Sequence, residues 1–328
     1  MSTILITGAS GLLGAHLIAA LSRAHRVVGI DRHSWWGDKP ITLLRGDVAA
    51  RGFFADAVAS VAPEIVIHCA AMVDVEACEQ DPAQAYACNT QATNVLVRTV
   101  SPECLVVYIS TDSVFKGEKP FATEEEPPSP RSVYARSKLQ GEWEVEQGTE
   151  RHLIVRTNFY GWSSGRKKTS AEWLYHVLET RQPVTLFNDV FFTPIYVVDF
   201  VERLIRLIEQ GHRGRVHVAG GERVSKYQFG ALMASVAQIS MDHVRVGSID
   251  EAALSAPRPK DMSLCCERFQ RLTGMPLPGC QEGLQRFLND RGSLLSARAS
   301  GGLAHDSIPA SLATTTGQPV GKSVRLDV

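Results

Sequence analysis

The 328-residue sequence lacks the features that mark several large classes of protein. It has no apolar run long enough to span a membrane, and its start lacks the basic segment and long apolar stretch of a secretion signal. Lys and Arg number 34 against 35 Asp and Glu, so the formal net charge of -1 provides no basic field for nucleic acid. We therefore expect a protein that binds neither a membrane nor nucleic acid.

Cysteine is sparse and irregularly spaced. The seven cysteines form no Cys-x-x-Cys pair, and the ten histidines form no metal-binding motif. We therefore expect no metal site. An odd number of cysteines without a secretion signal is typical of a reducing compartment, so the expected location is the cytoplasm.

Strand and helix patterns alternate through the first half of the chain. Short apolar runs predict buried strands at residues 4–7, 26–30, 65–69, 105–110 and 152–158. Apolar residues at helical spacing predict helices between them, at 12–22 and 83–100. This alternation predicts an α/β fold built on a Rossmann-type, doubly wound parallel sheet.

A glycine-rich turn lies between the first predicted strand and the first predicted helix. Glycine lets the backbone turn tightly and approach phosphate groups, and the helix N-terminus stabilises their charge. We therefore predict that this turn binds the pyrophosphate of a dinucleotide. The predicted contacts are Gly8, Ser10, Gly11, Leu12, Leu13 and Gly14.

Asp31 ends the second predicted strand, where a carboxylate can hydrogen-bond the ribose hydroxyls of adenosine. A carboxylate repels a 2′-phosphate, so Asp31 favours NAD(H) over NADP(H), although the adjacent Arg32 could offset this. Alternatively, Asp31 is a turn residue at a strand end. Asp47 and Val48 could reach the adenine, but a solvated loop aspartate is an equal alternative.

A second motif supplies groups for proton transfer. Tyr134 and Lys138 are four residues apart and share one face of a predicted helix. We expect the ammonium to lower the pKa of the phenol, which can donate a proton to a developing alkoxide. Thr111 follows a buried strand, where open α/β sheets bind ligands, and its hydroxyl can bind the substrate oxygen. Tyr-x-x-x-Lys also occurs in ordinary helices, but with the glycine turn it indicates nicotinamide chemistry on a carbonyl or alcohol.

These motifs resemble the extended short-chain dehydrogenase/reductases, and among them the dTDP-4-dehydrorhamnose reductase-like branch of nucleotide-sugar enzymes. The resemblance covers residues 1–290, through segments 7–11, 68–71, 109–115, 134–138, 156–158 and 258–264. It implies an NAD(P)H-dependent reductase of a nucleotide-activated keto-sugar, of the dTDP-4-keto-6-deoxy-hexose type. It also suggests a homodimer.

The resemblance gives Thr111, Tyr134 and Lys138 the catalytic roles. It implies further cofactor contacts from Ala70, Ala71, Val73 and Asn89, and from Tyr134 and Lys138 themselves. It implies substrate contacts from Thr111, Asp112, Ser113, Asn158 and Trp162. Trp162 has an equal alternative as a core residue of the second lobe. The basic segment 161–168 could meet the substrate diphosphate or be a solvated loop.

Three parts are expected along the chain. Residues 1–160 are predicted to form the dinucleotide-binding domain, and residues 161–292 an interleaved substrate-binding lobe with returning elements of the first fold. Residues 293–328 are small and polar, and we expect a disordered tail. Two other functions remain open: a nucleotide-sugar epimerase that uses the same residues with bound NAD, and a non-catalytic NAD(P)-binding regulatory subunit.

Overall fold

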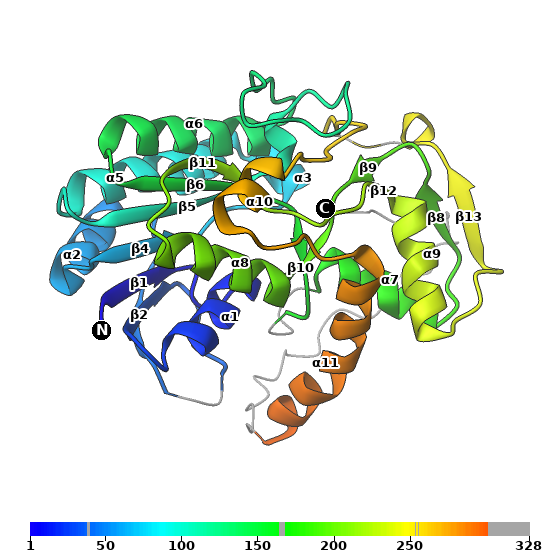
Figure 1. The fold of residues 1–328 in the computed structure, drawn as a ribbon, viewed down its shortest axis with the longest axis horizontal. Helices are drawn as coiled ribbons and strands as arrows, with labels where there is room; N and C mark the ends of the chain where they lie inside the picture. The colour runs from blue at the N-terminus through cyan, green and yellow to red at the C-terminus, as the bar shows by residue number, and fades with distance from the viewer. Residues whose placement is uncertain (38–39, 164–167, 253, 255, 301–328) are drawn as a thin grey trace, which may run out of the picture.

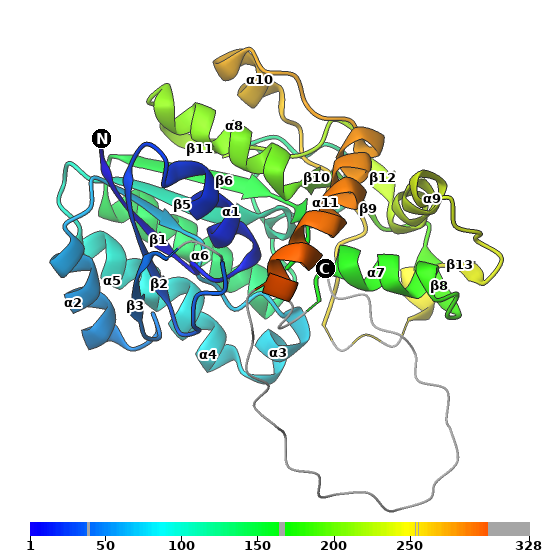
Figure 2. The same ribbon diagram turned by 90° about the horizontal axis from the view of Figure 1, so that it is seen from below.

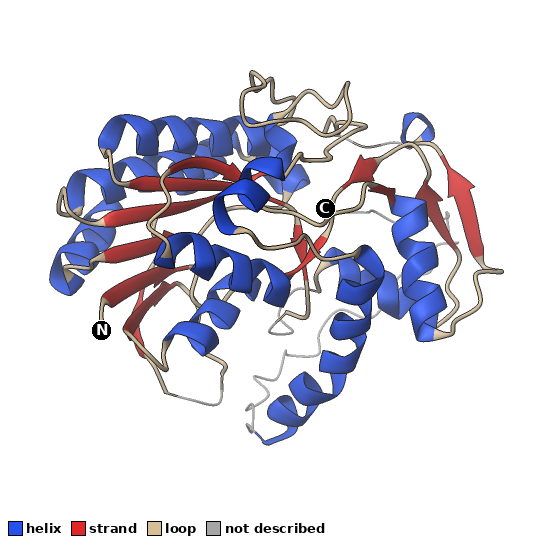
Figure 3. Ribbon diagram, viewed as in Figure 1, coloured by secondary structure: helices blue, strands red, loops and turns tan. Residues whose placement is uncertain are grey.

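The computed structural model describes residues 1–37, 40–163, 168–252, 254 and 256–300. At its centre lies a seven-stranded sheet of parallel strands in the order β11-β6-β5-β4-β1-β2-β3. Helices cover both faces of this sheet, and a second lobe lies beyond the carboxyl ends of its strands (Figures 1 and 3). The predicted doubly wound α/β fold is therefore confirmed.

The strand order places a crevice at the centre of the sheet. The strands are β1 (Thr3–Thr7), β2 (Arg26–Asp31), β3 (Thr42–Arg45), β4 (Ile65–His68), β5 (Leu105–Thr111), β6 (His152–Thr157) and β11 (Gly214–His217). Their order reverses between β1 and β4, which is where open α/β sheets bind ligands. Side chains alternate between faces, so Ile4 and Ile6 join one core cluster and Leu5 the other.

Two groups of helices sandwich the sheet. One face is covered by α1 (Leu12–Leu21) and α8 (Val197–Glu209), with α10 (Glu267–Thr273) against α8; the other is covered by α2 (Arg51–Val61), α5 (Ala92–Thr99) and α6 (Val133–Gly148) (Figure 2). Before α5 come α3 (Val75–Gln80), α4 (Pro82–Tyr86) and a π-helix, η1 (Ala87–Gln91). The segment 83–100, predicted as one helix, is therefore divided by a π-helical turn.

The second lobe is built from short strands and three longer helices. Its elements are β7 (Phe159–Tyr160), α7 (Ser170–Glu179), β8 (Val184–Phe187), β9 (Phe191–Phe192), β10 (Ile195–Tyr196), β12 (Val224–Ser225), α9 (Lys226–Ala237), β13 (Val244–Gly247), the 3-10 turn η3 (Ile249–Glu251) and α11 (Cys280–Ser300). One apolar cluster runs from Leu17 on α1 through Phe200 on α8 to Phe229 on α9. The lobe therefore shares its core with one face of the sheet, which holds the two sides of the crevice together.

The last helix extends beyond its expected end. Because α11 runs to Ser300, residues 293–300 of the segment predicted to be disordered are helical, and residues 301–328 lie outside the described residues. Among the helices that the structure describes, none is long and apolar enough to cross a membrane.

Candidate active site

The glycine-rich turn connects β1 to α1 and packs against the loop after β4. Gly8 has a φ of +67°, and a Cβ atom on it would lie 2.9 Å from the backbone nitrogen of Ala70. The N–H of Gly11 donates to the carbonyl of Gly8 at 2.9 Å and closes the turn. Gly11 is also the N-cap of α1 and has no side chain to accept from the first turn. This arrangement suits the oxygens of a pyrophosphate at the helix N-terminus.

Asp31 is buried at the end of β2 and faces the same turn. Its Oδ2 accepts the N–H of Ser10 at 2.9 Å, and its Oδ1 accepts the N–H of His33 at 2.8 Å. The carbonyl of Ser10 accepts from the indole N–H of Trp36 at 2.9 Å, so Ser10 is held from both sides. The adjacent Arg32 is exposed. The carboxylate is thus fixed beside the glycine turn. The bond from His33, two residues further on, also closes a local turn, so this geometry suits both the ribose prediction and the turn alternative for Asp31.

Other residues predicted to bind the cofactor lie in the hydrophobic core or in a local turn. Leu13 and Val48 are buried in the two core clusters, and Leu12 is partly exposed. The Oδ1 of Asp47 accepts the N–H of Ala49 at 2.9 Å. Asp47 therefore closes a local turn, which matches the loop alternative for this residue.

The loop after β4 forms the opposite side of the crevice. The hydroxyl of Thr7, at the end of β1, accepts the N–H of Ala70 at 3.1 Å and pairs with Nδ1 of His68 at 2.7 Å. Ala70 and Ala71 are partly exposed, and Val73 is 57% exposed. The cofactor contacts of these three residues stay a prediction.

Asn89 lies inside the π-helix η1 and is 1% exposed. Its Oδ1 accepts the N–H of Met72 at 2.8 Å, and its Nδ2 donates to the Met72 carbonyl at 3.0 Å and to the Ser137 hydroxyl at 2.9 Å. Asn89 therefore joins the loop after β4 to the residue that precedes Lys138. Its contact with Lys138 is therefore indirect, through the neighbouring Ser137.

Thr111, Tyr134 and Lys138 meet where β5 ends and α6 begins. The hydroxyl of Ser132 caps α6 by accepting an N–H of its first turn at 3.2 Å. The Thr111 hydroxyl lies close enough to Tyr134 to affect the pKa of the phenol. Lys138 is 3% exposed, and its ammonium lies 4.0 Å from the centroid of the Tyr108 ring. The three predicted catalytic residues are thus assembled at one end of the crevice.

Burial sets the protonation of two of these groups. It raises the pKa of Tyr134 above the ordinary value, and the nearby hydroxyl of Thr111 opposes this by less. The phenol is therefore protonated at neutral pH and can donate a proton. Burial also lowers the pKa of Lys138 to about 8. Burial thus shifts the pKa of Tyr134 in the direction opposite to the lowering expected from Lys138.

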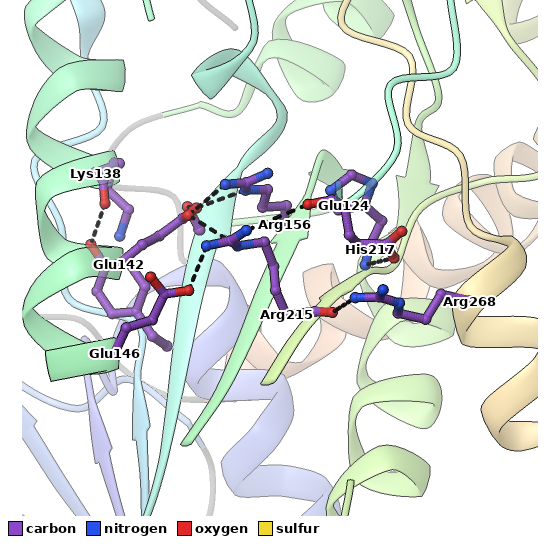
Figure 4. A network of polar contacts seen from close by, with 10 residues as sticks. Glu124, Lys138, Glu142, Glu146, Arg156, Arg215, His217 and Arg268 are labelled. Atoms are coloured by element: carbon purple, nitrogen blue, oxygen red, sulfur yellow. Dashed lines mark hydrogen bonds and ion pairs between the residues drawn. The ribbon is translucent and has the colours of Figure 1, made fainter. Parts of the chain in front are cut away.

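A buried ion pair anchors α6 beneath these residues (Figure 4). Glu142, one helical turn after Lys138, accepts from Nε of Arg156 at 2.9 Å and from its Nη2 at 2.6 Å, and both side chains are 0% exposed. Glu142 also accepts the hydroxyl of Ser110 at 2.5 Å. Since Ser110 precedes Thr111, one carboxylate positions both the helix and the strand end.

The same network reaches the far edge of the sheet (Figure 4). Nε of Arg215, on β11, lies 3.6 Å from Glu142, and the carbonyl of Arg215 accepts from Arg268 of α10 at 3.0 Å. Glu124, in the loop before α6, accepts the N–H of His217 at 2.8 Å. These contacts fix α6 relative to β6, β11 and α10.

The residues predicted to bind substrate lie mostly together. Asp112 is 2% exposed; its Oδ1 accepts the hydroxyls of Thr111 at 3.1 Å and Ser113 at 3.2 Å, and its Oδ2 accepts the amide of Asn158 at 2.5 Å. Burial raises the pKa of Asp112. A polar cluster thus extends from Thr111 toward the second lobe.

Trp162 lies apart from this cluster. Its indole stacks on Phe287 of α11, with ring centroids 4.3 Å apart, and its N–H donates to the Phe287 carbonyl at 2.5 Å. Tyr175 of α7 packs against it edge-on. These contacts favour the core alternative for Trp162. Residues 164–167 of the basic segment 161–168 lie outside the described residues.

The sequence analysis missed a lysine that the second lobe brings to the site. Lys226, the first residue of α9, is 8% exposed, and its ammonium lies 3.6 Å from the centroid of the Phe192 ring. The negative charge of Asp112 acts on it across the crevice. The sequence signal near Lys226 was only a Ser-x-x-Gln capping box at Ser225. Such a box predicts the start of a helix but does not indicate a ligand-binding residue.

A cavity of about 760 Å³ lies between the loop before α6 and the second lobe. Its lining carries cations, including Lys116, Arg131, Arg223 and Arg258, together with acidic and apolar residues. Arg258 pairs with Glu76 of α3 at 3.1 Å. This volume is in the range of small-molecule sites. Within the described residues, no group of three His, Cys, Asp or Glu side chains could hold a metal ion.

Comparison with known proteins gives consistent matches. The family model for the RmlD substrate binding domain matches residues 1–292. A dTDP-4-dehydrorhamnose reductase of Mycobacterium tuberculosis (strain ATCC 25618 / H37Rv) is 31% identical over 265 residues, which cover 78% of this chain and 82% of that protein. A probable low-salt glycan biosynthesis reductase of Haloferax volcanii, Agl14, is 31% identical over 293 residues, covering 85% of this chain and 95% of that one.

Solved structures agree with these matches. The dTDP-4-dehydrorhamnose reductase from Bacillus anthracis, in complex with NADP, is similar with a TM-score of 0.78 and 27% sequence identity. The similarity covers 88% of this chain and 99% of that one.

Proposed function

The chain belongs to the RmlD substrate binding domain family, and from this premise we propose that it is an NAD(P)H-dependent reductase of a dTDP-4-keto-6-deoxy-hexose. The observation that carries the proposal is the assembly of Thr111, Tyr134 and Lys138 beside the glycine turn. A hydroxyl, a protonated phenol and an ammonium at the carboxyl end of a parallel sheet suit the reduction of a carbonyl.

The crevice offers a fit for the cofactor along its whole length. The backbone N–H groups at the start of α1 would hold the pyrophosphate, and Asp31, bonded to Ser10 of the same turn, would bind the adenosine ribose. Ala70, which packs against Gly8, and the exposed Val73 would line the nicotinamide ribose and ring. When bound, the reduced nicotinamide supplies the hydride. We propose NAD(P)H as the cofactor, with NADH slightly favoured by the carboxylate of Asp31.

Thr111, Tyr134 and Lys138 have separate roles in the proposed reduction. The hydroxyl of Thr111 hydrogen-bonds the keto oxygen and orients it toward Tyr134. The phenol of Tyr134 donates its proton to that oxygen as negative charge develops. The ammonium of Lys138 stabilises the phenolate that remains and binds the nicotinamide ribose.

The substrate spans the crevice and the second lobe. Asp112, Ser113 and Asn158 surround the sugar next to Thr111. We place the nucleotide diphosphate in the cavity lined by Arg223 and Arg258, because cations suit phosphate oxygens.

The first test is oxidation of NADH and NADPH by the purified protein with a dTDP-4-keto-6-deoxy-hexose. Tyr134→Phe should lower kcat by about 10²–10⁴-fold, because it removes the proton donor, and should leave cofactor affinity nearly unchanged. Tyr175→Phe, on α7 and away from the crevice, is the matched control and should keep its rate.

Two results would contradict the proposal. Oxidation that continues in Tyr134→Phe at a near-normal rate removes Tyr134 from the mechanism. A wild-type protein that binds cofactor and oxidises none with this substrate is not a reductase of this keto-sugar.

A further inference from the structure

Lys226 is held in place by the start of α9. Ser225 caps the helix by accepting the N–H of Gln228 at 3.0 Å, and the side chain of Gln228 returns a bond to the N–H of Ser225 at 2.8 Å. The N–H of Lys226 donates to the carbonyl of Val190 at 2.9 Å. The lysine backbone is therefore rigid, and its direction is fixed.

The side chain of Lys226 is 8% exposed, and its ammonium has no hydrogen-bonded acceptor among the described residues. Its contact is the face of Phe192, and among the described residues no hydrogen bond or ion pair reaches its Nζ. Burial lowers the pKa of Lys226 to about 8, Asp112 opposes this, and Arg258 adds to it. An ammonium buried to this degree is costly unless a ligand provides an acceptor.

Asp112 has the opposite charge, and its neighbour Ser113 contacts the second lobe near Lys226. The Ser113 hydroxyl donates to the sulfur of Met262 at 3.6 Å, and the N–H of Met262 donates to the carbonyl of Phe191, next to Phe192, at 2.8 Å. The three hydrogen-bond donors to Asp112, Thr111, Ser113 and Asn158, all come from its own side. Burial raises the pKa of Asp112, and the charge of Lys226 opposes this. The two groups act on each other through the crevice without forming an ion pair.

The chemistry of this gap selects one kind of ligand. A phosphate near Asp112 would meet a negative charge and be repelled, whereas a neutral group with neighbouring donors and acceptors can satisfy both sides. Vicinal hydroxyls do this, because one can donate to the carboxylate while the other accepts from the ammonium. Asp112 is bonded to Thr111, so such hydroxyls would lie next to the reacting carbonyl.

We propose that Lys226 binds the hexose hydroxyls beside the keto group together with Asp112, and so determines which sugar is reduced. This inference rests on the proposed function and adds a specificity-determining residue from the second lobe. Lys226 touches the substrate and takes no part in the hydride or proton transfer.

The test compares two substrates and three variants. The substrates are the dTDP-4-keto-6-deoxy-hexose and an analogue that lacks the hydroxyl next to the carbonyl. Lys226→Met keeps the apolar stem on Phe192 and removes the charge, whereas Lys226→Arg keeps the charge. Lys119→Met, an exposed lysine in the loop before α6, is the matched control. NAD(P)H affinity and thermal unfolding report whether each variant is folded.

The wild type should prefer the full substrate by about tenfold or more in kcat/KM, because the analogue leaves buried polar groups unpaired. In Lys226→Met, kcat/KM should fall by about ten- to hundredfold with the full substrate and by much less with the analogue. The ratio of kcat/KM between the two substrates should therefore become smaller. Lys226→Arg should recover part of it, and Lys119→Met should match the wild type. NAD(P)H affinity should be unchanged in all three.

Each contrary result has its own meaning. If the wild type oxidises NAD(P)H with the keto-sugar and Lys226→Met keeps the full preference, the inference is wrong and the proposed function stands. If a folded wild type oxidises NAD(P)H with neither substrate, the proposed function fails and the inference fails with it.

Discussion

Both carboxylate oxygens of Asp31 accept backbone N–H groups, so this side chain shapes the glycine turn, and the proposed function gives it a second role at the cofactor. A residue with two such roles produces two effects when it is replaced. One effect is common to all cofactors, because the turn loosens. The other depends on the 2′ position of the adenosine ribose, because a carboxylate attracts hydroxyls and repels a phosphate.

Asp31→Ala should therefore weaken NADH more than NADPH. We expect the Kd of NADH to rise by about tenfold, since two hydrogen bonds to the ribose are lost, and the Kd of NADPH to rise by less. Titration of both cofactors measures this. Asp56→Ala, an exposed aspartate on α2, is the control. Equal losses for the two cofactors would remove Asp31 from ribose recognition.

At the scale of the element, the position of α6 is fixed by contacts between the helix and the sheet on which it packs. Tyr134, Lys138 and Glu142 follow one another at intervals of four, so one helical face carries both proposed catalytic groups and the carboxylate that anchors the helix. The anchor is ionic and wholly buried: Glu142 pairs with Arg156 on β6. Breaking such a pair leaves one uncompensated charge, whereas removing both charges does not.

Glu142→Gln and Arg156→Met should each cost about 3–5 kcal/mol of unfolding free energy, and the double variant should cost clearly less than their sum. Urea unfolding of the four proteins measures this cycle. Glu146→Gln, one turn further along α6 and 34% exposed, removes a partner of Arg215 and should cost no more than about 1 kcal/mol. Additive losses for the buried pair would show that it does not act as a unit.

At the scale of the whole molecule, α11 joins the two lobes. Tyr196 at the start of α8 donates to Asp290 of α11 at 2.5 Å, and Arg286 of α11 pairs with Glu202 of α8 at 3.0 Å. On the other side, Arg291 pairs with Glu179 of α7 at 2.6 Å. Trp162 lies between these contacts, stacked on Phe287. Its surroundings make it part of the joint between the lobes.

Trp162→Ala should lower the unfolding free energy by about 3–5 kcal/mol, because it removes a large side chain from a packed interface. Trp162→Phe keeps an aromatic ring against Phe287, so its unfolding free energy should fall by less. Its KM for the substrate should be unchanged. Thermal unfolding and steady-state kinetics measure the two effects. A raised KM with little loss of stability in Trp162→Phe would instead place Trp162 in contact with the substrate.

Sequence patterns predicted the parts of the site that lie close together along the chain. The glycine turn and the pair Tyr134 and Lys138 each belong to one strand-helix or helical segment, so local spacing reveals them. The packing of Trp162 on Phe287 joins residues 125 positions apart, and no local pattern predicts it. Lys226 reaches the crevice for the same reason, because only the fold brings α9 opposite β5.

Some elements were also missed because their own sequences are weak signals. β11 reads Gly-Arg-Val-His, which has one aliphatic residue, and it becomes a strand through parallel pairing with β6. The first and last residues of β3 are exposed, and this edge strand pairs with β2 alone. In both cases the edge of an existing sheet determines the structure more than local propensity does.

The π-helix η1 has a consequence for how this sequence can change over time. A π-helical turn is an α-helix that holds one additional residue, and Asn89 lies within it. Deletion of any one residue from that turn would restore an ordinary helix and rotate everything on one side of it by about 100° relative to the other. Asn89 could not then keep Met72 and Ser137 together while the hydrophobic face of α5 stayed on the sheet. We therefore expect this segment to tolerate substitutions better than deletions of single residues.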